Sequence, residues 1–205
     1  MCTLYLIRHG ATDSAGHVLT GRAPGIHLSE RGSKQAAQLP HRFANVPIAA
    51  IYATPLERTQ ETAAPLAQEL GLSVEISEDL TEVDYGEWMG RAVKDLLQDA
   101  LWNRFNAFRS STGIPGGESM LQIQTRVVGC LNRIRDSFPD QHIAIVSHGD
   151  PIKAAVSHYI GLHLDMFFRF QISPASVTIV RVSSTDAAVI ALNILDVGFA
   201  EYLTS

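Results

Sequence analysis

Residues 143–151 read Ile-Ala-Ile-Val-Ser-His-Gly-Asp-Pro, and this stretch decides the expected fold. Positions 143–146 are apolar throughout, as is typical of a central strand that helices cover on both faces. Pro151 fits the first turn of a helix, so the strand is expected to lead directly into one. A buried strand joined in this way to a helix indicates an α/β protein with a largely parallel sheet.

The rest of the chain repeats this alternation of short apolar runs and longer helical patterns. Between residues 120 and 134, apolar side chains recur at helical spacing on one face. A short polar turn at 183–186 joins the last two apolar runs, which predicts an antiparallel hairpin at one edge of a mixed sheet. Strands are expected at residues 4–7, 48–53, 74–76, 143–146, 177–182 and 189–194, and helices at residues 29–43, 56–70, 91–105, 118–137 and 151–160.

The composition is that of an ordinary globular protein. The 205 residues are 46% hydrophobic and 18% charged, which excludes a disordered or fibrous chain. A chain of this length supports one well-buried core and is short for two, so residues 1–205 are expected to form a single domain. No apolar stretch approaches the roughly 18 residues of a membrane span, and the N-terminal apolar run is too short for a signal peptide.

Charge and cysteine content narrow the classes of partner. The chain has 16 Lys and Arg against 21 Asp and Glu, a formal net charge of −5, which argues against nucleic acid or an anionic membrane as partner. This balance still permits one local basic pocket. Cys2 and Cys130 are too few for a disulfide framework and lack zinc-binding spacing, and Cys130 is expected to be a small buried hydrophobe. A reduced, cytoplasmic protein is therefore expected.

Polar residues follow three of the expected strands. The first strand runs into Arg8-His9-Gly10, the second is followed by Arg58, and the central strand ends at His148-Gly149. Because ligands bind beyond the carboxyl ends of strands in open α/β sheets, two imidazoles and two guanidinium groups are expected on one rim. The glycines let the backbone approach a ligand closely. This rim predicts a pocket for a phosphate-like dianion.

Two helix starts are expected to strengthen this anion site. Residues 54–57, Thr-Pro-Leu-Glu, match a capping box with Thr54 as the N-cap. Asp150 precedes a proline, which predicts a second N-cap at this carboxylate. His148 and Gly149 would then lie where unpaired backbone N–H groups and the helix dipole attract an anion.

A metal site is the main rival to an anion site, because histidine is the commonest metal ligand. Arg8 adjoins His9, however, so a cation would lie in a field that guanidinium groups have already made positive. The sequence also lacks the HxH and HExxH spacings of metal-binding histidines. We therefore expect no metal ion and no cofactor.

Residues 80–90, Leu-Thr-Glu-Val-Asp-Tyr-Gly-Glu-Trp-Met-Gly, combine acidic and aromatic side chains in a turn-rich loop. The carboxyl groups of Glu82, Asp84 and Glu87 form either a solvated acidic surface or the source of a general acid for the basic pocket. In the second case, partial desolvation beside an aromatic ring keeps one carboxyl group protonated. The residues alone leave both alternatives open and do not say which of the three acts.

Four of these segments, taken together and in this order, resemble the histidine phosphatase superfamily, also called the phosphoglycerate-mutase-like family. They are Leu-Ile-Arg-His-Gly at residues 6–10, Thr-Pro-Leu-Glu-Arg-Thr-Gln-Glu-Thr at 54–62, Leu-Thr-Glu-Val-Asp-Tyr-Gly at 80–86 and Val-Ser-His-Gly at 146–149. The resemblance spans most of the chain. It implies a three-layer α/β/α sandwich with a mixed, mostly parallel central sheet, and metal-free chemistry through a phosphohistidine.

The resemblance also implies roles for the matched residues. His9 corresponds to the family's nucleophile and Glu82 to its proton donor. The phosphate pocket would be formed by Arg8, Arg58, His148 and Gly149, with His148 also acting in catalysis and with Thr20 and Gly21 touching the phosphate or its substituent. Beyond the matched motifs, the candidate substrate-lining residues are Arg22, Trp88, Arg91, Arg109 and Asp150.

The chain departs from the family pattern in two places. Ala15 stands where the family often has an asparagine that helps to hold the phosphate, so this hydrogen bond is either missing or supplied by a neighbour such as Thr12 or Ser14. The insertion with paired arginines that is typical of cofactor-dependent mutases is absent, and residues 115–119, Pro-Gly-Gly-Glu-Ser, resemble the loop of the phosphatase branch. We therefore expect hydrolysis of a small phosphorylated metabolite.

Two other functions stay open. A phosphoglycerate-type mutase would return the phosphoryl group to a second hydroxyl instead of to water. A non-catalytic domain that binds a phosphorylated ligand is less favoured, because His9, His148 and Glu82 are all present. The residues do not identify the substrate, and they permit a homodimer as well as a monomer.

Overall fold

The structure is a computed structural model that describes residues 1–196 and 198–202. Within these residues the central sheet has six strands in the order β3-β2-β4-β1-β5-β6. The first four strands in the chain run parallel, whereas the last two form an antiparallel hairpin that pairs with β1 through β5, so the predicted mixed sheet is confirmed. The strands are β1 (Cys2–Arg8), β2 (Ile48–Ala53), β3 (Val74–Ile76), β4 (His142–Ser147), β5 (Val177–Val182) and β6 (Ala187–Ile194).

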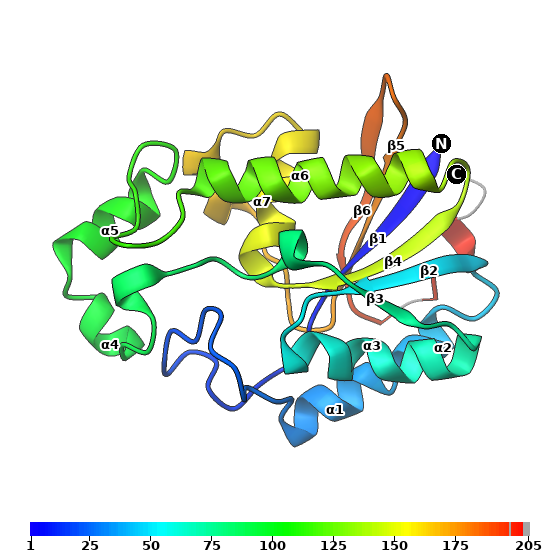
Figure 1. The fold of residues 1–205 in the computed structure, drawn as a ribbon, viewed down its shortest axis with the longest axis horizontal. Helices are drawn as coiled ribbons and strands as arrows, with labels where there is room; N and C mark the ends of the chain where they lie inside the picture. The colour runs from blue at the N-terminus through cyan, green and yellow to red at the C-terminus, as the bar shows by residue number, and fades with distance from the viewer. Residues whose placement is uncertain (197, 203–205) are drawn as a thin grey trace.

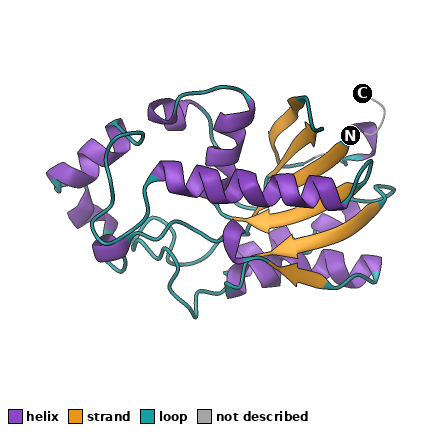
Figure 2. Cartoon of the chain, turned by 45° about the horizontal axis from the view of Figure 1, so that its top comes forward, coloured by secondary structure: helices purple, strands orange, loops and turns teal. Residues whose placement is uncertain are grey.

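Helices cover both faces of the sheet, so the fold is the three-layer α/β/α sandwich that the resemblance implied (Figure 1). One face carries α1 (Glu30–Ala36), α2 (Leu39–Arg42) and α3 (Glu57–Leu70), and the other carries α6 (Met120–Ser137) and α7 (Gly149–Tyr159). Figures 1 and 2 both place α4 (Val93–Leu96) and α5 (Ala100–Ala107) beyond the end of the sheet where the parallel strands finish. Short 3-10 helices lie at Glu78–Leu80, Gly86–Trp88, Leu164–Arg169 and Ala200–Tyr202.

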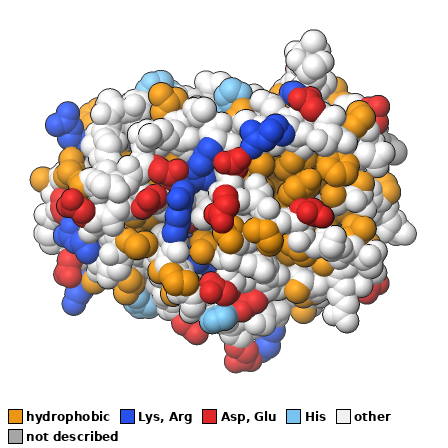
Figure 3. Space-filling model, viewed as in Figure 1, with side chains coloured by type: hydrophobic (Ala, Val, Ile, Leu, Met, Phe, Trp, Pro, Cys, Tyr) orange, Lys and Arg blue, Asp and Glu red, His pale blue; other side chains and the backbone are white. Residues whose placement is uncertain are grey.

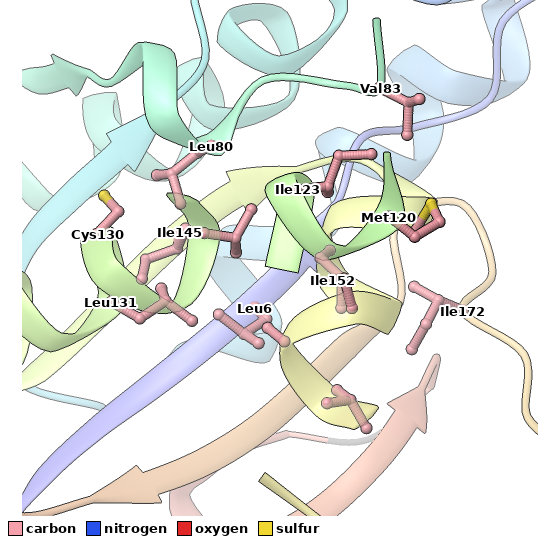
Figure 4. Packing of buried hydrophobic residues seen from close by; sticks show 14 of the residues in the cluster. Leu6, Leu80, Val83, Met120, Ile123, Cys130, Leu131, Ile145, Ile152 and Ile172 are labelled. Atoms are coloured by element: carbon pink, nitrogen blue, oxygen red, sulfur yellow. The ribbon is translucent and has the colours of Figure 1, made fainter. Parts of the chain in front are cut away.

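Alternate residues of the central strands enter two hydrophobic cores, one on each face of the sheet. In β1, Leu6 packs into the core under α6 and α7, while Ile7 packs into the core under α3. Figure 4 shows the first core, in which Leu6 and Ile145 lie among Ile123 of α6 and Ile152 of α7. Because helices bury both faces of β1 and β4, neither strand has a polar face, which explains the uniformly apolar run at 143–146.

Two of the predicted helices are each divided in two. Residues 29–43 form α1 and α2 because Pro40 lacks a backbone N–H group and fits only the first turn of a new helix. Residues 91–105 form α4 and α5 because the Asp99 side chain accepts hydrogen bonds from the backbone N–H groups of Leu101 and Trp102 and so caps a new helix.

The predicted caps at Thr54 and Asp150 are wrong. α3 begins after Leu56, which occupies the N-cap position without a side-chain hydrogen bond, and the Thr54 hydroxyl lies against His148 instead. The N-cap of α7 is His148, so Asp150 lies within the first helical turn. The carboxylate of Asp150 does not cap the helix because Arg109 holds it in an ion pair.

Candidate active site

A polar cavity of about 240 Å³ lies at the carboxyl ends of the parallel strands. β1 supplies Arg8 and leads directly to His9, α3 supplies Arg58 after β2, and α7 supplies Gly149 after β4. The structure therefore brings together the ends of the three strands that the sequence analysis singled out. Residues of connecting segments complete the wall, among them Thr12, Thr20, Gly21, Glu82, Tyr85, Gln171 and Ile172.

The His9 imidazole is buried in this cavity and holds one fixed tautomer. Its Nδ1 lies 2.7 Å from the backbone carbonyl oxygen of Gly10. Because a carbonyl oxygen only accepts hydrogen bonds, Nδ1 carries the ring proton and Nε2 keeps its lone pair. Burial, followed by the charges of Arg58 and Arg8, lowers the pKa of His9 to about 3. The ring is therefore a neutral imidazole with Nε2 available as a nucleophile.

Two guanidinium groups stand beside this imidazole, each anchored to the backbone by one nitrogen. Nη1 of Arg8 donates to the carbonyl oxygen of Ile172 at 2.6 Å, and Nη2 of Arg58 donates to that of Gly21 at 2.7 Å. Among the described residues, Nε of Arg8 and Nη1 of Arg58 are buried without a hydrogen-bond partner. Unpaired buried donors on fixed cations suit the binding of a phosphate or another oxyanion.

His148 lies against His9 and is not itself among the residues that line the cavity. Its ring is fully buried, and its centroid lies 5.2 Å from that of His9. Nε2 contacts the Thr54 hydroxyl at 3.0 Å, whereas Nδ1 has no hydrogen-bond partner within the part of the chain that the structure describes. Burial, followed by electrostatic repulsion from a protonated His9 and from Arg58 and Arg8, holds the pKa of His148 well below its ordinary value.

Gly149 opens α7 directly beside the guanidinium group of Arg8. A Cβ atom at this position would lie 3.4 Å from Cζ of Arg8, so a larger side chain would compete with a ligand for the same space. The first backbone N–H groups of this helix of 11 residues also lie here. The helix dipole therefore adds to the attraction of the two arginines for an anion.

The structure separates the three carboxyl groups of residues 80–90. Glu82 lines the cavity and accepts a hydrogen bond from the Val83 backbone at 2.9 Å, while Asp84 accepts one from the Gly86 backbone and Glu87 is exposed. Burial, followed by the nearby Asp150 carboxylate, raises the pKa of Glu82 to about 7. A carboxyl group with this pKa is able to donate a proton near neutral pH.

Of the predicted substrate-lining residues, Asp150 lines the cavity and Arg109 lies behind it. The buried Arg109 guanidinium donates to the Asp150 carboxylate at 2.8 Å, and the Tyr85 hydroxyl donates to the same oxygen at 3.0 Å. Burial by itself would raise the pKa of Asp150, but the charge and hydrogen bond of Arg109 lower it overall. On this side of the cavity, Asp150 is therefore an ionised carboxylate that Arg109 holds in place.

The structure does not place Arg22, Trp88 or Arg91 on the wall of this cavity. Arg22 donates to the Glu118 carboxylate, and Arg91 is paired with Asp99. Trp88 is 2% exposed and packs against other aromatic rings of the hydrophobic core. These three were candidates only, and their ion pairs and apolar packing explain why they lie away from the cavity wall.

Two further cavity residues bear on the departures noted in the sequence. Thr12 and Ala15 both line the cavity, and the Thr12 hydroxyl lies 3.3 Å from the Ser14 hydroxyl, so these two neighbours are the groups near the place that an asparagine would have occupied. Lys153 of α7 also lines the cavity and was not predicted. Its position four residues after Gly149, on the same helical face, is the signal that could have revealed it.

No group of three or more His, Cys, Asp and Glu side chains that could hold a metal ion occurs among residues 1–196 and 198–202. In the same residues, no helix is long and apolar enough to cross a membrane. Cys2 and Cys130 are free and buried.

The chain matches several known proteins along nearly its whole length. A model of the histidine phosphatase superfamily (branch 1) covers residues 4–195. Phosphoserine phosphatase 1 of Hydrogenobacter thermophilus is 30% identical over 199 residues, which are 95% of this chain and 93% of that protein. Probable phosphoglycerate mutase GpmB of Cronobacter sakazakii is 34% identical over 165 residues, 79% of this chain and 76% of that protein. The solved structure of Bacillus stearothermophilus YhfR superposes with a TM-score of 0.90 at 26% identity, covering 96% of this chain and 98% of its own.

The chain therefore belongs to the histidine phosphatase superfamily, as its motifs implied. Within this superfamily the protein is a phosphatase. A relative of similar length is itself named as a phosphatase.

Proposed function

We propose that the protein hydrolyses small phosphomonoesters in two steps, with His9 as the temporary acceptor of the phosphoryl group. The observation that carries this proposal is the hydrogen bond from Nδ1 of His9 to the Gly10 carbonyl oxygen, at 2.7 Å. It leaves the Nε2 lone pair free in a cavity where donors of Arg8 and Arg58 have no partner among the described residues. A nucleophile and an oxyanion site thus occupy the same space.

In the first step, Nε2 of His9 attacks the phosphorus atom in line with the leaving oxygen. The N–P bond forms as the P–O bond to the alcohol breaks, and the Glu82 carboxyl group gives its proton to the departing alkoxide. Arg8, Arg58 and His148 stabilise the charge on the equatorial oxygens, which is the dominant contribution to catalysis in phosphoryl transfer. Gly149, Thr20 and Gly21 border the same phosphate.

In the second step, water hydrolyses the phosphohistidine. The Glu82 carboxylate, having lost its proton, takes one from a water molecule, whose oxygen attacks the phosphorus atom. The N–P bond breaks and its electron pair returns to Nε2 of His9. Inorganic phosphate leaves, and both residues regain their initial protonation states.

The volume of the cavity and the mixed charges on the protein surface support a small metabolite as substrate. A cavity of about 240 Å³ is smaller than the pockets that hold drug-sized molecules. On the face in Figure 3, Lys and Arg side chains are interspersed with Asp and Glu side chains, which favours a small ligand over nucleic acid. Phosphoserine is a reasonable first substrate to test, given the name of the Hydrogenobacter relative. We also propose a cytoplasmic location, in keeping with the two free cysteines.

A second candidate function is that of a phosphomutase, which the similarity to the probable phosphoglycerate mutase of Cronobacter sakazakii supports. A mutase transfers the phosphoryl group from His9 to a second hydroxyl group of the substrate, whereas a phosphatase transfers it to water. Release of inorganic phosphate, measured against formation of the isomer from one phosphoglycerate, separates the two.

The test is a label transfer with a matched inactive variant. Brief incubation with a ³²P-labelled phosphomonoester is expected to leave acid-labile label on the wild-type protein and none on His9→Asn. His17→Asn, which changes an exposed histidine, is the control and should label like the wild type. If phosphate is released from a broad substrate panel but the protein is never labelled, the proposal of a phosphohistidine intermediate is wrong. If the panel yields neither free phosphate nor labelled protein, the protein is a binding domain.

A further inference from the structure

Lys153 carries a positive charge on the cavity wall that the proposed hydrolysis does not use. It lies in the second turn of α7, is 6% exposed and lines the same cavity as Arg8 and Gly149. Its ammonium nitrogen lies 5.3 Å from the ring centroid of Phe167 and 5.0 Å from that of Phe168. These rings hold the ammonium group by cation–π contact in a residue that lines the cavity.

The ammonium group of Lys153 has no anionic partner within 4.0 Å in the described part of the chain. Asp150, three residues earlier on α7, is already bound by the Arg109 guanidinium at 2.8 Å and the Tyr85 hydroxyl at 3.0 Å. Burial lowers the pKa of Lys153, although the Asp150 charge opposes this effect. A buried cation without a bound anion is costly, so a ligand anion at this point would be favoured.

The positive charges along the cavity wall outnumber the two negative charges of a phosphomonoester. The guanidinium groups of Arg8 and Arg58 match the two negative charges of a phosphomonoester. Asp150 is balanced by Arg109 behind it, and Glu82, with a pKa of about 7, carries at most a partial charge at neutral pH. One positive charge, that of Lys153, remains for one further negative charge on the ligand.

The position of Lys153 fixes where that charge would lie. Gly149, at the phosphate end of the cavity, and Lys153 are four residues apart and therefore lie on the same face of α7, with a rise of about 6 Å between them. We propose that Lys153 binds a carboxylate of the substrate, so that the preferred substrates are small phosphomonoesters with a carboxylate a few bonds from the phosphorus atom. This inference rests on the proposed phosphatase function.

The test compares two substrates that differ only at this group. 3-Phosphoglycerate has a carboxylate where glycerol 3-phosphate has a hydroxymethyl group. The wild type should prefer 3-phosphoglycerate, and Lys153→Met, which removes the charge but keeps an unbranched side chain, should lose about 10- to 100-fold in kcat/KM for it, mainly through KM. For glycerol 3-phosphate the same variant should stay within about twofold of the wild type, because the phosphate site is untouched.

Two further variants complete the design. Lys153→Arg keeps the charge and should recover most of the preference, and Lys94→Met, which removes an exposed lysine of α4, should leave both substrates unaffected. Equal losses on the two substrates in Lys153→Met, or no preference in the wild type, would overturn the inference. If the wild type turns over neither substrate nor p-nitrophenyl phosphate, the proposed function fails, and calorimetric binding of the two compounds to wild type and Lys153→Met still decides the role of Lys153.

Discussion

The imidazole rings of His9 and His148 lie 5.2 Å apart between centroids, at an interplanar angle of 64°. Burial, together with the charges of Arg58 and Arg8, lowers the pKa of both rings, so both are neutral in the free protein. A phosphate dianion between the guanidinium groups would cancel their charge and so favour the protonated form of a neighbouring imidazole. His148, whose Nδ1 is unpartnered among the described residues, is then able to take up a proton while Nε2 of His9 attacks.

Replacing Arg58 with lysine should impair catalysis although the charge is kept. Nη2 of Arg58 is bound to the Gly21 carbonyl oxygen while Nη1 is free of protein partners among the described residues, and one ammonium group cannot serve both positions. By analogy with loss of an oxyanion-stabilising donor, kcat/KM should fall by about 10²- to 10³-fold. Steady-state kinetics check this, with Arg31→Lys on the exposed face of α1 as control. A loss below tenfold would argue against Arg58 as a phosphate ligand.

The sequence was sufficient to predict that four basic residues meet at one edge of the sheet, because each of them follows a short apolar run that is typical of a strand. These residues are Arg8, His9, Arg58 and His148. Each residue comes just after an apolar run, and the ends of parallel strands share one edge of a sheet. The mixed sheet with an antiparallel hairpin at one edge also follows from the sequence pattern.

The errors arose where a side chain has a tertiary partner that the sequence does not reveal. Thr54 has the spacing of a cap, but its hydroxyl binds His148 from a distant strand end. Trp88 is near the acidic loop in sequence, but aromatic packing draws it into the core. Lys153 was missed because one lysine in a helix is usually solvated, although its spacing from Gly149 places it on the helical face that meets the cavity.

Glu82→Gln should separate good from poor leaving groups. Gln cannot protonate an alkoxide, so the first turnover of an alkyl phosphate should become slow, whereas p-nitrophenolate needs no proton and should still appear as a burst of about one equivalent. Because Gln also cannot act as the base of the second step, labelled His9 should accumulate. Rapid-quench measurements test both effects, with Glu87→Gln as the exposed control from the same loop. Equal slowing of both substrates in the first turnover would remove Glu82 as the acid.

The pH profile of the first step follows from the pKa of Glu82, which burial and the Asp150 carboxylate raise to about 7. The proton donor is present below this pH and is lost as the pH rises through it. The first-turnover rate for an alkyl phosphate should therefore decline above about pH 7, while the rate for p-nitrophenyl phosphate should not show this decline. A profile for the alkyl substrate that stays flat from pH 6 to 9 would contradict the assignment.

Glu82 should also make folding stability depend on pH. Its pKa rises from an ordinary value of 4.5 to about 7 on folding, so the folded state holds this proton more tightly. The favourable contribution is complete below about pH 4.5 and is lost as the pH rises through about 7. Glu82→Gln, which is uncharged throughout, should therefore raise Tm relative to the wild type more at pH 8 than at pH 5. Thermal unfolding at the two pH values measures this, and a difference that is the same at both would mean that the carboxyl group is not desolvated.

Thr54→Val should weaken the site through His148. The Thr54 hydroxyl lies 3.0 Å from Nε2 of His148 and 2.8 Å from the Thr59 hydroxyl, and Thr59 in turn donates to backbone carbonyl oxygens. Because the Thr59 proton is used in this way, the Thr54 hydroxyl donates to Thr59 and accepts from Nε2 of His148, which leaves Nδ1 of His148 without a proton.

Valine keeps the shape of Thr54 but leaves this buried Nε2 unsatisfied, at a cost of about 1–3 kcal/mol in the free energy of unfolding. The same change frees the His148 ring to reorient, so kcat should fall and the inhibition constant for inorganic phosphate should rise. Thr54→Ser restores the hydroxyl and should recover both, whereas Thr125→Val on the exposed face of α6 should change neither. If Thr54→Val lowers Tm but leaves kcat and phosphate inhibition at wild-type values, the hydroxyl contributes only to packing and His148 is oriented by other contacts.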